Sequence, residues 1–169
     1  RLDSEILLAK ILKKKREELL VSLDQKVNSY TIRNFKKLIS RRSLKEPIAY
    51  ILKKKEFWSK DFYVNKDTLI PRPETELLVE KIIKIYKKRN IYILDIGTGT
   101  GCILLSILSE LKNSQGIGVD ISHKAIQIAS KNSKKHKLTH KAKFYSKSFT
   151  EVYGNKFDLR QILILIPLF

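Results

Sequence analysis

Residues 93–103 read Ile93-Leu94-Asp95-Ile96-Gly97-Thr98-Gly99-Thr100-Gly101-Cys102-Ile103, and this stretch decides the fold. An apolar strand runs into a turn with three alternating glycines, and a second apolar run of helical length follows. Glycine at these positions permits backbone angles and a close approach that a Cβ atom would prevent. The helix that follows turns its free N–H groups toward whatever lies over the turn. The stretch therefore predicts a binding turn for a nucleotide-type cofactor.

The glycine spacing distinguishes between two kinds of nucleotide cofactor. A dinucleotide fingerprint reads Gly-x-Gly-x-x-Gly. Here Gly97, Gly99 and Gly101 alternate, and Asp95 precedes the first of them by two residues. This form favours S-adenosylmethionine over a dinucleotide as the cofactor.

A second signal for the cofactor lies downstream of the glycines. Residues 116–120 read as a short buried strand that ends in Asp120. An acid about twenty residues past such a loop is placed to accept both hydroxyls of a ribose. A purely structural glycine turn and a helix-capping aspartate are the alternative interpretation. The two features together, at this spacing, favour the cofactor site.

Composition sets the outer bounds. The chain has 169 residues, of which 43% are hydrophobic, with only 6 Gly and 4 Pro, so it can bury a sizeable core. No apolar run approaches the roughly twenty residues of a membrane span, and we expect a cytoplasmic protein without membrane contact. Cys102 is the only cysteine and is expected to pack as a small apolar residue. The pattern predicts no metal site.

The formal net charge of +18 suggests acidic partners. Basic clusters at 13–16, 53–55 and 134–137 are suited to a phosphate backbone, so ribosome or RNA contact is one hypothesis. The lysines are also spread over the whole chain, and an AT-rich coding sequence explains the same composition. Both interpretations stay open.

The chain is predicted to be an α/β protein with three parts. Residues 1–49 show helical spacing and form an N-terminal helical bundle, whose first helix Asp3 or Ser4 would cap. Residues 50–70 form a β-hairpin linker, with aromatic and β-branched residues on either side of the turn. Residues 71–169 form the third part, in which Glu74 or Thr75 starts the first helix.

Strands and helices alternate in the third part. The expected elements are strand 91–95, helix 102–112, strand 116–120, helix 122–135, a strand near 142–145 and a final apolar segment. This alternation predicts a parallel sheet, the first half of a Rossmann-like, doubly wound domain.

Three segments carry a resemblance to a known family. They read Glu56-Phe57-Trp58, then Leu69-Ile70-Pro71-Arg72-Pro73-Glu74-Thr75-Glu76-Leu77-Leu78-Val79, then the glycine-rich stretch quoted first. With residues 2–8 and 46–51, this order resembles the HemK/PrmC family of protein-(glutamine-N5) methyltransferases, which act on peptide chain release factors. The resemblance covers nearly the whole chain. It implies S-adenosylmethionine as cofactor, a release factor as partner, and substrate recognition by residues 1–49.

The resemblance also implies roles for individual residues. Bordering the cofactor would be Gly97, Thr98, Gly99 and Gly101, with Asp95 shaping the turn and Asp120 holding the ribose. A wall around the cofactor would come from Arg72, Pro73 and Glu74. A rigid interdomain turn with a helix cap is the alternative role for these last three residues.

One motif of the family is missing. An Asn-Pro-Pro-Tyr segment supplies the family's hydrogen-bond acceptors for the glutamine amide, and it should follow residues 157–159, where this chain reads Arg160-Gln161-Ile162. We therefore assign no catalytic residue and expect a C-terminally truncated family member, inactive alone. A frameshift, a chain cut at this point or a genuine strand would explain the tail. A nucleic-acid amino-methyltransferase and a noncatalytic release-factor-binding fragment are the alternative functions.

Overall fold

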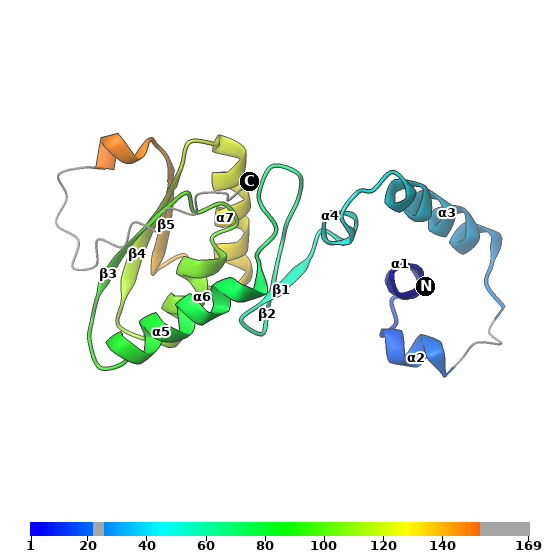
Figure 1. The fold of residues 1–169 in the computed structure, drawn as a ribbon, viewed down its shortest axis with the longest axis horizontal. Coiled ribbons are helices and arrows are strands. Elements are labelled where there is room, and N and C mark those ends of the chain that lie inside the picture. Colours follow the sequence, from blue (N-terminus) through cyan, green and yellow to red (C-terminus); the bar gives the residue numbers. More distant parts are fainter. Residues whose placement is uncertain (22–25, 153–169) are drawn as a thin grey trace. The chain divides into compact units, whose positions relative to one another are not determined.

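The computed structural model describes residues 1–21 and 26–152, and the chain divides into two compact units, Arg1–Lys53 and Lys54–Phe169 (Figure 1). The first unit is helical. Its helices are α1 (Leu2–Leu12), α2 (Arg16–Leu20), α3 (Ser29–Ser43) and α4 (Ile48–Leu52). The predicted N-terminal helical bundle is thus confirmed.

The start of α1 differs from the prediction. The helix begins at Leu2 with Arg1 at its N-cap, so the expectation that Asp3 or Ser4 caps it is wrong. Asp3 lies in the first turn, and its Oδ2 accepts a hydrogen bond of 2.6 Å from Nε of Arg42 on α3. The carboxylate therefore ties two helices together instead of capping one.

Side chains on α1 hold the other helices of the first unit. Leu7 is fully buried between them. Glu5 pairs with Arg16 of α2 at 2.7 Å, and Nζ of Lys10 donates to the carbonyl of Leu52 in α4 at 2.6 Å. Because these polar contacts are partly exposed, apolar packing supplies most of the stability of this unit.

The second unit opens with a β-hairpin of β1 (Lys55–Phe57) and β2 (Lys60–Phe62), paired antiparallel. The strands are shorter than predicted, because Tyr50 still belongs to α4. Trp58 and Ser59 form the two-residue turn, each with a φ of +52°. Both residues have a left-handed backbone conformation, and a turn of this kind matches the twist of the two hairpin strands.

The rest of the second unit is the predicted alternation of helices and strands. Its elements are η1 (Pro73–Thr75), α5 (Glu76–Tyr86), β3 (Tyr92–Ile96), α6 (Cys102–Glu110), β4 (Gln115–Asp120), α7 (His123–Lys135), β5 (Ala142–Ser146) and η2 (Phe149–Val152). Strands β3, β4 and β5 are parallel and lie in that order, which confirms the predicted sheet. The final apolar segment and residues 157–159 lie outside the described residues.

The sheet has a helix-covered face and a second face, because successive side chains of a strand point to opposite sides. Ile93 packs with α5 and α6 in the main core, whereas its neighbour Leu94 packs with Val119 in a separate cluster. In Figure 1 the labelled helices of this unit lie to one side of the strands. A Cβ atom at Gly116 would come within 2.7 Å of Leu104, so this glycine lets α6 approach β4 closely.

Candidate cofactor site

The glycine turn follows β3 and is bound to the neighbouring strand. Gly97, Gly99 and Gly101 have φ values of +73°, +53° and +75°, which L side chains rarely adopt. The backbone N–H groups of Gly97 and Thr98 both donate to the carbonyl of Val119 in β4, at 2.9 and 3.0 Å. The turn therefore sits at the carboxyl ends of two parallel strands, where ligands bind in open α/β sheets.

One side of the turn is open and the other is packed. A Cβ atom built on Gly97 meets nothing within 4 Å, and one on Gly99 meets only the carbonyl oxygen of Gly97, at 3.8 Å. At Gly101 the same atom would lie 3.2 Å from Phe144 and 3.3 Å from Ala129. The first two glycines thus border free space that a ligand can fill, while the third lets the turn pack onto α7.

Asp120 lies at the edge of this free space. Its Oδ2 accepts a hydrogen bond from the N–H of Gly99 at 3.0 Å, and its Oδ1 accepts one from the N–H of Ser122 at 2.9 Å. The carboxylate is held rigidly beside the turn, yet each oxygen keeps a lone pair for a further donor. These lone pairs suit two neighbouring hydroxyl groups such as those of a ribose.

Asp95 is held inside the core instead. It is 2% exposed, and its Oδ2 accepts a hydrogen bond of 2.7 Å from the hydroxyl of Thr98. Burial raises the pKa of Asp95 to about 6, the Thr98 hydrogen bond opposes that rise, and the charge of Asp120 adds to it. The buried Asp95 side chain thus contacts the turn from the core side, through Thr98.

The structure does not bring the Arg72, Pro73 and Glu74 side chains into this arrangement. Pro73 and Glu74 lie in η1, Arg72 is its N-cap, and all three are exposed ahead of α5. Within residues 26–152, no hydrogen bond or ion pair joins their side chains to the glycine turn. Their role as a wall around the cofactor stays a prediction.

Two residues beside the turn were missed by the sequence reasoning. Asn132 of α7 is fully buried and hydrogen-bonds the carbonyl oxygen of Thr100 at 2.9 Å. The sequence could have indicated Asn132, because helical spacing places this polar residue on the same face of the helix as the buried Ile128 and Ala129. Ile121 directly follows Asp120 and is 83% exposed, so it offers a large apolar side chain next to that carboxylate.

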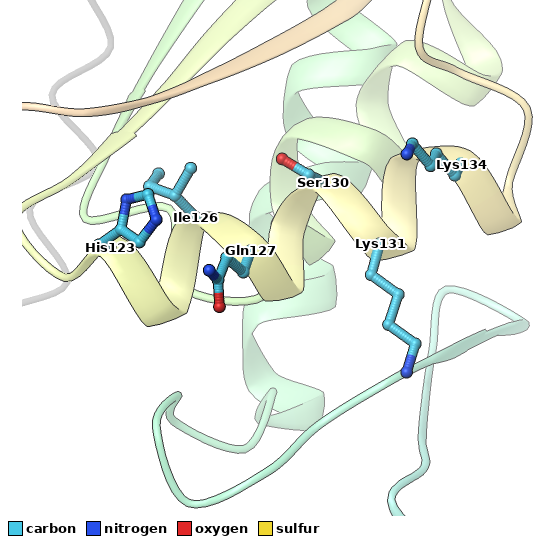
Figure 2. A pocket seen from close by; sticks show the side chains of 6 residues that line it. All are labelled: His123, Ile126, Gln127, Ser130, Lys131 and Lys134. Atoms are coloured by element: carbon cyan, nitrogen blue, oxygen red, sulfur yellow. The ribbon is translucent and has the colours of Figure 1, made fainter.

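A separate hollow of about 430 Å³ lies along the outer side of α7 (Figure 2). It is lined by His123, Ile126, Gln127, Ser130, Lys131 and Lys134, none of which the sequence predicts at the cofactor site. The ammonium of Lys131 lies 3.5 Å from the centre of the Tyr63 ring. The hollow is therefore distinct from the turn, and two exposed lysines, Lys131 and Lys134, border it.

Residues 1–21 and 26–152 contain neither a metal-binding cluster nor a membrane-spanning helix. No three His, Cys, Asp or Glu side chains gather there in a way that would hold a metal ion. None of the helices described is both long enough and apolar enough to span a bilayer.

Fold and site together define a class of protein. A parallel sheet whose first strand enters a turn of three left-handed glycines, and whose second strand ends in an acid bound to that turn, is a Rossmann-like methyltransferase domain. Comparison with known proteins agrees, since residues 87–167 match the family described as a methyltransferase domain. Residues 1–52 match the PrmC N-terminal domain.

Relatives share both parts. The release factor glutamine methyltransferase of Buchnera aphidicola subsp. Schizaphis graminum is 42% identical over 94% of the chain and 58% of its own length. The bifunctional methyltransferase of Rickettsia typhi is 39% identical over 94% of the chain and 34% of its length. The chain belongs to the PrmC-type methyltransferases, and it spans from about a third to somewhat over half of these relatives.

A solved structure shares the fold. The tRNA (uracil-54, C5)-methyltransferase of Pyrococcus abyssi, in complex with S-adenosyl-L-homocysteine, has a TM-score of 0.51 and 20% identity. The likeness covers 62% of this chain and 26% of that one. At this identity the match concerns the architecture alone.

Proposed function

We propose that this chain binds S-adenosylmethionine over Gly97 and Gly99 and serves the methylation of a glutamine side-chain amide in peptide chain release factors, in the cytoplasm. The observation that carries the proposal is the Asp120 carboxylate, fixed by the N–H of Gly99 at 3.0 Å beside free space above the turn. Family membership supplies the class of reaction.

The residues at the turn have separate tasks in this proposal. S-adenosylmethionine supplies an electrophilic methyl group when bound. The free lone pairs of Asp120 accept the ribose hydroxyls, and Ile121 offers the adenine ring an apolar surface. Asp95 keeps the turn in shape through Thr98.

Recognition of the release factor is proposed for the first unit. Its first 52 residues match the PrmC N-terminal domain, and the Buchnera relatives that share it are named release factor glutamine methyltransferases. Tyr30 on α3 and Leu44 at its end are 70% and 80% exposed, so apolar contact area is available there. Large exposed apolar side chains of this kind are common at protein interfaces.

The proposal is tested first by binding, because the 169 residues contain no Asn-Pro-Pro-Tyr segment. The chain is titrated with S-adenosylmethionine in a calorimeter, next to Asp120→Asn and to Asp61→Asn as a charge-matched control. Asp61 pairs with Lys54 in the hairpin and does not approach the turn. We expect binding by the unaltered chain and the control, and at least tenfold weaker binding by Asp120→Asn. Equal binding by all three proteins would contradict the assignment.

A second function, RNA contact, is favoured by the basic surface of α7. Residues 121–150 contain eight lysines and no aspartate or glutamate. Lys131 and Lys134 are exposed along the hollow of Figure 2, next to Gln127 and Ser130. Spaced cations with neighbouring hydrogen-bond donors are suited to a phosphate backbone. We propose this surface as the place where the chain touches RNA.

The RNA proposal has its own test. Fluorescence anisotropy of a labelled single-stranded RNA compares the unaltered chain with the double variant Lys131→Gln and Lys134→Gln. A control pair, Lys87→Gln and Lys88→Gln, removes the same charge from the exposed end of α5. Because each phosphate contact to a single strand contributes about 0.7 to the dependence of affinity on salt, only the α7 variant should lower that slope, by about 1.4. Equal loss in both variants would mean that net charge alone attracts RNA.

A further inference from the structure

Asn132 uses its whole side-chain amide to join three distant parts of the second unit. Its Nδ2 donates to the carbonyl oxygens of Thr100, at 2.9 Å, and Tyr63, at 3.0 Å. Its Oδ1 accepts from the N–H of Tyr63 at 2.7 Å. The residue is fully buried on α7, while its partners belong to the glycine turn and to the segment that follows β2.

The bond to Thr100 fixes one peptide group of the turn. The carbonyl of the Thr100–Gly101 peptide is held by Asn132, and the N–H of the same peptide donates to the carbonyl of Thr98 at 2.8 Å. A peptide group held at both ends cannot rotate without breaking a buried hydrogen bond. Gly101 follows with a φ of +75°. Asn132 thus helps to set the left-handed path that keeps the space over the turn open.

The two hydrogen bonds between Asn132 and Tyr63 anchor the segment that follows β2. Tyr63 is hydrogen-bonded through both its N–H and its C=O to the same amide, and the next residue, Val64, is fully buried. The chain then continues to Pro71 and to the three residues predicted to flank the cofactor, of which Arg72 caps η1 and Pro73 and Glu74 lie in it. The Asn132 side chain therefore fixes the position of the start of this segment relative to the glycine turn.

From this geometry we infer that Asn132 is a positioning residue of the S-adenosylmethionine site, coupling the Tyr63 segment to the shape of the glycine turn. The inference rests on the proposed cofactor. Asn132 does not itself touch the ligand. Its loss changes affinity because the turn is no longer held in the binding conformation before the ligand arrives.

Two variants test the inference. Asn132→Leu keeps the branching and the number of heavy atoms and removes all three hydrogen bonds, whereas Asn132→Asp keeps the acceptor but sets a carboxylate oxygen against two carbonyls. The matched control is Ser114→Ala: its hydroxyl is buried and accepts from the N–H of Ile91 at 3.2 Å, at the end of the sheet remote from the turn. Affinity for S-adenosylmethionine and thermal unfolding are measured for each protein, with affinity taken where all are folded.

We expect both Asn132 variants to bind at least tenfold more weakly, while Ser114→Ala lowers the unfolding temperature and keeps its affinity within twofold. If Asn132 variants bind as the unaltered chain does, the inference fails and the proposed function stands. If the unaltered chain does not bind, both fail together.

A measurement on the unaltered chain covers the case in which the variants do not fold. Hydrogen exchange at the Tyr63 amide, which donates to Asn132, is followed as S-adenosylmethionine is added. If Asn132 couples Tyr63 to the glycine turn, exchange at the Tyr63 amide slows as ligand is added, and the ligand concentration at half effect equals that for binding. Unchanged exchange at Tyr63 under saturating ligand would overturn the inference.

Discussion

The hydroxyl of Thr98 donates a 2.7 Å hydrogen bond to Oδ2 of Asp95 in the core beneath the glycine turn. Burial raises the pKa of this carboxyl from 3.8 to about 6, although the Thr98 hydrogen bond and a backbone hydrogen bond at Leu104 oppose the rise. The folded protein therefore keeps a proton on Asp95 at mildly acidic pH that the unfolded chain has already released. At neutral pH the charge is buried at the expense of stability.

Asp95 consequently makes stability depend on pH. Because its pKa is higher in the folded state, its contribution is fully present below pH 3.8 and is lost as the pH rises through about 6. A difference of this size corresponds to about 3 kcal/mol. We expect Asp95→Asn to raise the free energy of unfolding by about 2 kcal/mol at neutral pH and by almost nothing near pH 4. Urea unfolding of both proteins at the two pH values measures the difference.

Thr98→Val is the companion variant. It removes the hydrogen bond that opposes the pKa rise and leaves the side-chain shape nearly unchanged. It should therefore destabilise the protein more at neutral pH than near pH 4, the reverse of Asp95→Asn. A loss of equal size at both pH values would show that Asp95 does not titrate as described.

We expect Gly97→Ala to affect mainly cofactor binding and Gly118→Ala to affect mainly stability. At Gly97 the added methyl meets no atom within 4 Å, so the cost is the left-handed backbone alone, about 1–2 kcal/mol. The same methyl occupies the proposed cofactor space, and we expect binding of S-adenosylmethionine to be lost in a folded protein. Calorimetric titration and thermal unfolding measure the two effects.

At Gly118 the methyl would lie 2.6 Å from Phe144 and 2.7 Å from the Thr98 hydroxyl. We expect Gly118→Ala to lower the free energy of unfolding by about 1–3 kcal/mol, because a packed core must move apart. The two variants together distinguish a glycine that borders the proposed cofactor space from a glycine that is needed for core packing. A Gly97→Ala protein that binds normally would refute the placement of the cofactor.

The hairpin turn offers a stabilising change. Ser59 has a φ of +52°, which is costly for serine and free of strain for glycine. We expect Ser59→Gly to raise the free energy of unfolding by about 0.5–1 kcal/mol, measured by urea unfolding. The control Ser130→Gly, within α7, should lower it by about 0.5–1 kcal/mol, since glycine weakens a helix interior. Destabilisation in both cases would argue against a left-handed turn.

Glu76 at the start of α5 anchors the same hairpin. Its Oε1 accepts a 2.8 Å hydrogen bond from the backbone N–H of Trp58. We expect Glu76→Ala to lower the free energy of unfolding by about 1–2 kcal/mol and to shift the emission of Trp58, the only tryptophan of the chain. Glu80→Ala, an exposed residue of the same helix, should change neither quantity. Identical emission spectra for all three proteins would rule out the anchor.

The order of elements in the second unit was predictable from the sequence. Alternating glycines at 97, 99 and 101 encode positive φ angles directly, and the change from strand to helix period marks β3, α6, β4 and α7 in turn. Each of these signals lies within a few residues of the chain. The first cap was mispredicted because Asp3 had a partner 39 residues away.

What the tertiary structure decided is how these pieces constrain each other. Asn132 looked like one more polar residue of a lysine-rich helix, yet its partners lie 69 and 32 residues away. The raised pKa of Asp95 likewise results from burial, which no spacing reveals. Backbone preferences and periodicity are local and can be read from the sequence. Burial and long-range hydrogen bonds exist only once packing has removed water from the groups that meet, so they are properties of the fold.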